Sequence, residues 1–193
     1  MELADLDLNK VYTYADYFKW EFEARVELIK GKIYEMSAPN RLHQKISTYL
    51  NAMFFNYLRG KKCGVYAAPF DVRFPRKSKD DKDILTVVQP DICVVCDESK
   101  LDERGCIGAP DIIVEILSPS NNKKELKYKY DLYEEAGVKE YWVVFPIYET
   151  IEVYVLQNGV FLPSRPFVAG DTIGSSVLEG FTLDLAELFE GTL

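Results

Sequence analysis

The stretch that most constrains the fold is residues 110–118, which read PDIIVEILS. Most of it is a nearly continuous run of large aliphatic side chains, which is typical of a strand buried on both faces of a sheet. Glu115 stands in the middle of this run. A carboxylate in an apolar layer is costly unless it is paired, hydrogen-bonded or bound to a metal. The run therefore predicts an inner strand that carries one specifically partnered acid.

The pattern around this strand alternates strands with two long helices. Apolar residues recur three and four apart from Leu42 to Leu58, which predicts an amphipathic helix with Asn40 as its N-cap. A second helix is predicted over residues 121–136, with Gly137 as its C-cap. Strands or hairpins are expected at 26–36, 65–74, 87–95, 110–118, 141–146 and 150–156, and short helices at 12–20 and 181–189. This order predicts an α/β fold with a mixed central sheet flanked by helices.

The length and hydropathy of the chain limit its number of domains and its location. At 193 residues it suits one domain, so we expect a single domain over residues 1–193. The acidic N-terminus lacks the apolar segment of a signal peptide, and no apolar run approaches the ~18–20 residues of a membrane span. We therefore expect a cytoplasmic location and no membrane partner.

The four cysteines are expected to be small buried thiols in a reducing compartment. Cys93 and Cys96 form a C-x-x-C motif, but their segment alternates like a strand. Residues three apart on a strand point to opposite faces, which does not suit a shared metal ion. No second C-x-x-C motif and no histidine pair completes a zinc site.

The net charge of −8 argues against strong non-specific binding of nucleic acid, because phosphate contacts dominate that affinity. The charge is unevenly distributed, however. Residues 149–193 carry seven acids and one base, whereas residues 59–82 carry eight bases and three acids. Local basic surface is therefore compatible with an acidic chain, although solvated loops also explain such runs.

Asp91 and Glu115 carry the first chemical hypothesis. Because side chains alternate along a strand, Asp91 shares a face with Cys93, and Glu115 shares one with Ile113. If the two strands are neighbours, both carboxylates can project from the same face, where they repel unless a cation lies between them. Mg²⁺ prefers oxygen ligands, often one or two carboxylates with waters and a substrate phosphate. The pair therefore predicts metal-assisted phosphodiester hydrolysis with Mg²⁺ or Mn²⁺.

Lys129 carries the second hypothesis. It lies three residues after Leu126 and four before Tyr133, so it borders the apolar face of the second helix. Its ammonium group could reach the sheet and orient a nucleophilic water. Glu125, one turn earlier, could pair with it instead, and the spacing leaves both alternatives open.

Three motifs together carry a family resemblance. They are QPD ending at Asp91, APDIIVEILSPS at 109–120, and Glu125 and Lys129 followed by GVKEYW at 137–142. With them the chain resembles the Uma-two family of restriction endonucleases, a branch of the PD-(D/E)xK nuclease superfamily, over about residues 12–156. The remaining residues 157–193 are expected to add strands and a short helix. The resemblance implies a restriction-endonuclease-like fold, in three α/β/α layers, with DNA as substrate and a homodimeric state.

The resemblance also implies roles for particular residues. Asp91 and Glu115 match the metal-binding acids, and Lys129 matches the lysine that assists the attacking water. The superfamily motif places this lysine two residues after the second acid, where this chain has Leu117. In this family the role passes to the following helix, where Lys129 is expected.

Glu27 and His43 are weaker candidates. By family position Glu27 is a possible third acidic ligand, but an exposed hairpin residue is an equal interpretation. His43 is the single histidine, so histidine-rich metal sites are excluded. It could contact phosphate, hold Glu27, or be a partly buried structural residue.

The leading hypothesis is a metal-dependent endonuclease that hydrolyses phosphodiester bonds in DNA and needs no small-molecule cofactor. The alternative is a nuclease-fold protein that no longer cleaves and serves as a nucleic-acid-binding or assembly module. A binding module has little reason to converge carboxylates where a phosphate must lie, which favours the enzyme. A hydrolase for a smaller phosphodiester fits the negative charge, but no specific motif supports it.

Overall fold

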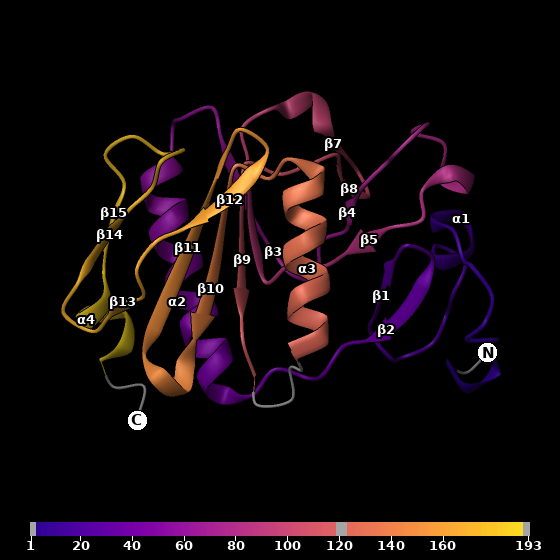
Figure 1. The fold of residues 1–193 in the computed structure, drawn as a ribbon, viewed down its shortest axis with the longest axis horizontal. Helices are drawn as coiled ribbons and strands as arrows, with labels where there is room; N and C mark the ends of the chain where they lie inside the picture. The colour runs from indigo at the N-terminus through magenta and orange to yellow at the C-terminus, as the bar shows by residue number, and fades with distance from the viewer. Residues whose placement is uncertain (1–2, 119–122, 191–193) are drawn as a thin grey trace.

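The computed structural model describes the side chains of residues 3–118 and 126–190 and the backbone of 123–125. Its central sheet has seven strands, in the order β12-β11-β10-β9-β6-β3, with β13 pairing with β11 (Figure 1). The strands are β3 (Gly64–Ala67), β6 (Ile92–Val95), β9 (Ile112–Ile116), β10 (Glu140–Phe145), β11 (Thr150–Gln157), β12 (Val160–Pro163) and β13 (Phe167–Val168). Because β9 runs parallel to β10 and antiparallel to β6, the sheet is mixed, as predicted.

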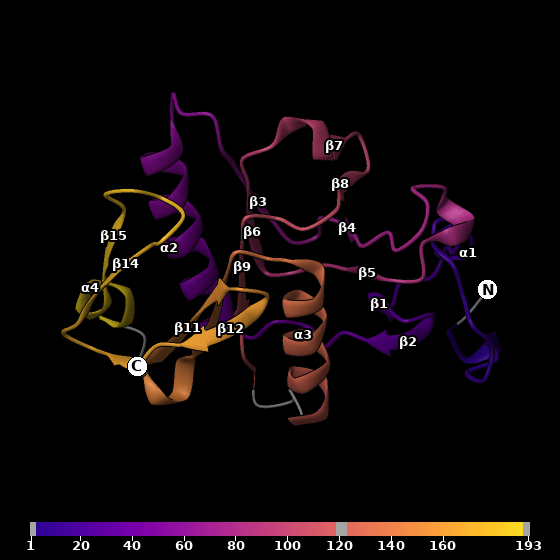
Figure 2. The same ribbon diagram turned by 45° about the horizontal axis from the view of Figure 1, so that its top comes forward.

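Two long helices cover the two faces of this sheet (Figures 1 and 2). They are α2 (Arg41–Leu58) and α3 (Lys123–Ala136). On one face Phe54 of α2 packs against Trp142 of β10. On the other face Tyr133 of α3 packs against Tyr141 of the same strand. The predicted three-layer α/β/α arrangement is therefore confirmed.

The ends of both helices follow from local sequence. The Asn40 side chain accepts a hydrogen bond from the backbone N–H of His43 at 2.9 Å, which satisfies a free donor at the start of α2. Gly137 follows α3 with a φ of 85°, a left-handed conformation that glycine adopts without steric cost. Both predicted caps are confirmed.

A second sheet of six strands, in the order β2-β1-β5-β4-β8-β7, was not predicted (Figure 1). Its strands are β1 (Val26–Ile29), β2 (Lys32–Glu35), β4 (Val72–Arg73), β5 (Val87–Val88), β7 (Leu101–Asp102) and β8 (Gly105–Ile107). The expected strands 65–74 and 87–95 each divide, with one part in each sheet. Pro69 and Pro90 stand at these divisions, and proline interrupts a ladder because it lacks an N–H.

The hairpin expected at 26–36 is present as β1 and β2, with Lys30 and Gly31 at positive φ in its turn. The helix expected at 12–20 is shorter, and the segment 181–189 divides into a strand and a helix. The remaining elements are α1 (Tyr14–Tyr17), β14 (Thr172–Gly174), β15 (Thr182–Asp184), α4 (Leu185–Phe189) and four 3₁₀ turns at Leu3–Asp5, Asp81–Asp83, Glu98–Lys100 and Pro146–Tyr148. Among the helices of the described residues, none is long and apolar enough to cross a membrane.

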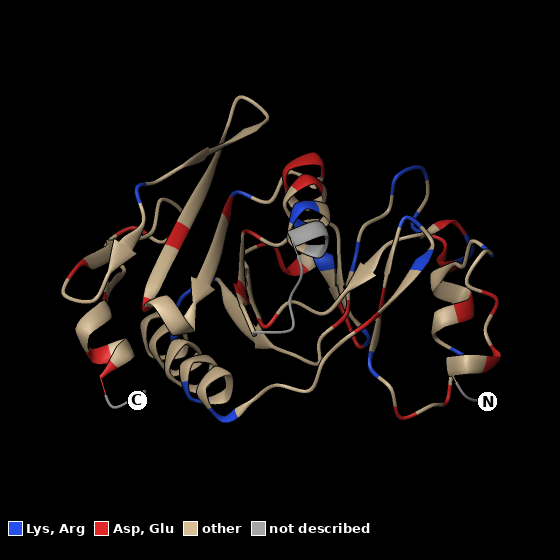
Figure 3. Cartoon of the chain, turned by 60° about the horizontal axis from the view of Figure 1, so that its bottom comes forward, with Lys and Arg blue, Asp and Glu red and all other residues tan. Residues whose placement is uncertain are grey.

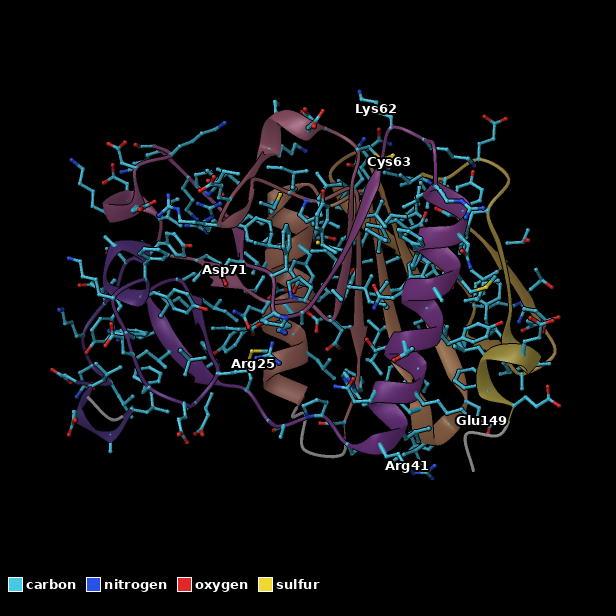
Figure 4. The ribbon with its side chains drawn as sticks, turned by 180° about the vertical axis from the view of Figure 1, so that it is seen from behind. Arg25, Arg41, Lys62, Cys63, Asp71 and Glu149 are labelled. Atoms are coloured by element: carbon cyan, nitrogen blue, oxygen red, sulfur yellow. A yellow bond between two sulfur atoms is a disulfide. The ribbon has the colours of Figure 1, made fainter. Side chains whose placement is uncertain are left out.

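The expectation of four free thiols was wrong. Cys63, directly before β3, and Cys96, directly after β6, form a disulfide that joins these two antiparallel strands. Figure 4 labels Cys63. Cys93 and Cys106 are free and buried, as expected. The C-x-x-C spacing was uninformative because the partner of Cys96 lies on the neighbouring strand, 33 residues away.

Candidate active site

The candidate site lies where β6 begins beside the end of β9. Their antiparallel register pairs Ile92 with Val114, so Asp91, which directly precedes β6, stands opposite Glu115. Both acids line a cavity of about 60 Å³, together with Leu117 and Lys129. The strands are therefore neighbours, as the hypothesis of paired carboxylates requires.

Lys129 points from α3 into the protein, onto two carboxylates. Its Nζ lies 3.0 Å from Glu115 Oε1 and 3.2 Å from Glu27 Oε1, and the residue is 5 % exposed. The side chain of Glu125, the alternative partner, lies outside the described residues. The ammonium group thus stands beside Glu115, and Lys129 lines the same cavity as Leu117, the position at which the superfamily motif has its lysine.

Glu27 is not an exposed hairpin residue, because it is only 1 % exposed. It belongs to β1 of the six-stranded sheet, and its Oε1 also accepts a hydrogen bond from the backbone N–H of Gln89 at 2.8 Å. It does not line the cavity with Asp91 and Glu115. Glu27 therefore forms an ion pair with Lys129 but does not join the two acids at the cavity.

His43 contacts Asp91 and not Glu27. Its Nε2 lies 3.1 Å from Asp91 Oδ1, while Asp91 Oδ2 accepts a hydrogen bond from the backbone N–H of Ile116 at 2.7 Å. The first turn of α2 positions the imidazole, and its Nδ1 is buried without a hydrogen-bond partner among the described residues. The orientation of Asp91 is thus set by α2 on one side and by β9 on the other.

Two residues that sequence analysis did not assign to the site contact it. The Tyr133 hydroxyl donates a hydrogen bond to Glu115 Oε1 at 2.6 Å. Arg25 lines the cavity and donates to the Gln89 side chain at 2.8 Å. The signal for Tyr133 was its position four residues after Lys129, on the same helix face. No local pattern indicated Arg25.

The electrostatics of the site are dominated by burial. Burial raises the pKa of Glu115 from its ordinary 4.5 to about 7; Lys129 lowers it, while the nearby acids Asp91 and Glu27 raise it further. For Lys129, burial lowers the pKa, but the attraction of Glu115 and Glu27 outweighs this and raises it. Lys129 therefore stays an ammonium group at neutral pH, whereas Glu115 is poised to lose its proton there.

The oxygen donors at the cavity fit Mg²⁺ or Mn²⁺. The hydrogen bonds that the described residues make to Glu115 all involve Oε1, which leaves Oε2 for another partner. Among the described residues, no group of three or more histidine, cysteine or acidic side chains is arranged around a metal position. Mg²⁺ needs no such group, because it commonly takes one or two carboxylates and keeps several waters.

The fold matches that of a solved protein. The chain superposes with a TM-score of 0.75 on a crystal structure from Anabaena variabilis described as a "putative nuclease belonging to DUF820", over 94% of this chain and 99% of that one. The sequence identity is 22%, so this likeness concerns the fold. An uncharacterized protein of Synechocystis sp. is 27% identical over 142 residues, which are 72% of this chain and 71% of the relative.

The family assignment rests on most of the chain. The sequence model of the Uma2 family, described as "Putative restriction endonuclease", matches residues 14–186. This range includes both carboxylates of the cavity, Lys129 and every strand of the two large sheets. The chain belongs to the Uma2 family of the restriction-endonuclease-like superfamily.

Proposed function

We propose that this protein is a Mg²⁺- or Mn²⁺-dependent endonuclease that hydrolyses phosphodiester bonds in DNA. The observation that carries the proposal is the buried ammonium group of Lys129, which bridges Glu27 and Glu115 beside the cavity that Asp91 lines. Burying three charged groups is costly, and such groups are concentrated at functional sites. The Uma2 family assignment points to a nuclease.

In this proposal Lys129 orients the attacking water and stabilises negative charge on the phosphate. A lysine that is held in its charged form does not accept a proton, so it serves as a hydrogen-bond donor. Its two described contacts use two of three N–H groups, which leaves one for the water or for a phosphate oxygen. Preorganised donors of this kind are among the largest contributions to catalysis.

Asp91 and Glu115 would hold the metal ion. A divalent cation supplies Lewis-acid stabilisation of the developing negative charge and activates water near neutral pH. His43 and the backbone N–H of Ile116 fix the orientation of Asp91, and Tyr133 fixes that of Glu115. Hydrolysis adds one water across a P–O bond and leaves one phosphate end and one hydroxyl end.

Nicking of a supercoiled plasmid with Mg²⁺ or Mn²⁺ tests this proposal. We expect wild-type nicking that requires the metal, and a loss of about 100-fold or more in Glu115→Gln and in Lys129→Ala, because the first removes a metal ligand and the second a donor to the water or the phosphate. Lys127→Ala is the matched control. Lys127 lies two residues away on the same helix, but its side chain is exposed and paired with Asp131.

The outcomes separate the proposal from its alternative. Equal nicking by wild type, Glu115→Gln and Lys129→Ala would contradict the assigned site. An absence of nicking by well-folded wild type, together with metal-free binding of DNA, would instead favour a nucleic-acid-binding module.

We also propose that the enzyme acts as a homodimer. Many nucleases of the superfamily act as assemblies of two subunits, each of which contributes one active site. Sedimentation of the protein with and without a short duplex would show a species of twice the 22.2 kDa chain mass. A monomer under both conditions would contradict this part of the proposal.

A further inference from the structure

A larger groove leads out of the cavity along α2. Its volume is about 550 Å³, and it shares Arg25, Pro39, His43 and Asp91 with the cavity. One wall is α2 between His43 and Phe55, and the other is β3 with the residues that follow it. Figure 4 views this face, where α2 and β3 run side by side, with Arg25 at one end and Cys63 at the other.

The segment that builds this groove is free of acids. Between Glu35 and Asp71 the sequence has no aspartate or glutamate and five bases, although the chain carries 31 acids and a net charge of −8. The bases are Arg41, Lys45, Arg59, Lys61 and Lys62. In Figure 3 the ribbon of α2 carries no acidic colour, and Asp91 is the single acid among the described residues that line the groove. These five bases do not line the groove, where Arg25 stands with Asp91, but the absence of acids from α2 removes charge repulsion between this wall and a polyanion.

The lining of the groove is chemically mixed. Gln44, Ser47, Thr48 and Asn51 present uncharged hydrogen-bonding groups along α2, and Phe55 lies at the far end with 59 % of its surface exposed. An exposed aromatic ring next to polar and basic groups is the arrangement on which unpaired bases stack. Paired bases are already stacked on one another, so this ring favours a single strand.

We propose that the groove binds an unpaired DNA strand, which enters the active site at Asp91 and runs along α2 to Phe55. Arg25, which lines both the cavity and the groove, contacts a phosphate where the two meet, and Phe55 stacks on a base. The helical stretch from His43 to Phe55 spans ~18 Å at 1.5 Å per residue, which is long enough to contact several nucleotides of one strand. The inference rests on the proposed nuclease function and adds the strand form of the substrate.

Fluorescence anisotropy with a labelled 12-nucleotide single strand, and with the duplex of the same sequence, tests this inference. The binding is measured in EDTA, so that it does not depend on cleavage. We expect tighter binding of the single strand and a loss of about fivefold or more in Phe55→Ala, because stacking is lost. Phe18→Ala is the matched control, because Phe18 is equally exposed at 59 % but lies after α1, outside the groove.

Three results would overturn the inference: no binding of the single strand, equal or tighter binding of the duplex, or equal binding by Phe55→Ala and wild type. The plasmid assay separates this failure from that of the proposed function. Metal-dependent nicking with no effect of Phe55→Ala on binding refutes the groove alone. Phe55-dependent binding of the single strand, with no metal-dependent cleavage of either the plasmid or that single strand, refutes catalysis alone.

Discussion

Glu115 has two oxygens in different surroundings. Oε1 accepts hydrogen bonds from the Lys129 ammonium group at 3.0 Å and from the Tyr133 hydroxyl at 2.6 Å, both from α3. Among the described residues, no hydrogen bond is made to Oε2. Because a buried carboxylate can exist only with such donors, the two partners on α3 are what allow an acid in the middle of an aliphatic strand.

Tyr133→Phe tests the contribution of the tyrosine. Removing the hydroxyl leaves Glu115 with one donor fewer, so we expect the free energy of unfolding in urea to fall by about 1–3 kcal/mol. Mn²⁺ affinity, measured by calorimetry without DNA, should also fall, because the carboxylate is less firmly oriented. In the control Tyr130→Phe the lost hydrogen bonds, to the Phe161 carbonyl at 3.4 Å and to Glu134, do not involve Glu115, so Mn²⁺ affinity should not change. Equal effects of the two variants would contradict the assignment.

Among the elements, β3 and β6 decide where Asp91 stands. Both belong to segments that leave one sheet and enter the other, and Asp91 follows the division at Pro90. The Cys63–Cys96 disulfide closes the opposite end of the same strand pair. The strand pair that positions Asp91 is thus covalently joined at the end away from the cavity.

Loss of the disulfide should destabilise the chain without removing the site. For a loop of 33 residues, the entropy of the unfolded chain predicts a loss of ~3–4 kcal/mol in the variant Cys63→Ala with Cys96→Ala. Urea unfolding with and without reductant measures this. Wild type with reductant should resemble the double variant, and reductant should not change the variant.

Thiol counting on the unfolded protein provides the control. Without reductant we expect two reactive thiols, from Cys93 and Cys106, and with reductant we expect four. Four thiols before reduction would show that the disulfide does not form.

At the scale of the molecule, a buried charge cluster joins the two large sheets. Glu27 comes from the six-stranded sheet, Glu115 from the seven-stranded sheet, and Lys129 from the helix that contacts both. The cluster spans 102 residues of sequence between Glu27 and Lys129. Its protonation should therefore affect the stability of the whole fold.

The pH dependence of unfolding tests this coupling in the metal-free protein. The pKa of Glu115 is about 7 in the folded chain, against an ordinary 4.5, so between these values the folded state binds more protons than the unfolded state. By linkage, the free energy of unfolding falls as pH rises from about 4.5 to about 7, by roughly 1–3 kcal/mol from this group.

Subtracting the profile of Glu115→Gln, which cannot titrate at this position, isolates the contribution. The difference between the two profiles should slope downward with rising pH in that window and flatten outside it. A flat difference throughout would show that Glu115 has no raised pKa in the folded chain.

The sequence by itself determined the local structure and part of the site. The spacing of apolar residues and the capping residues depend on a few neighbouring positions in the chain. For this reason α2, α3 and the β1–β2 hairpin were predicted with their ends nearly correct. The alternation along two strands allowed Asp91 and Glu115 to share a face if those strands were neighbours, and the motif resemblance indicated the family. These features depend on residues close together in the chain.

Only the tertiary structure decided how distant segments meet. It divided two expected strands between two sheets, paired Cys63 with Cys96, buried Glu27 behind Lys129, and turned His43 towards Asp91. Each of these contacts joins elements that are far apart in the sequence. No local propensity specifies such a partner, because the partner depends on the path of the whole chain and on which charged groups become buried together.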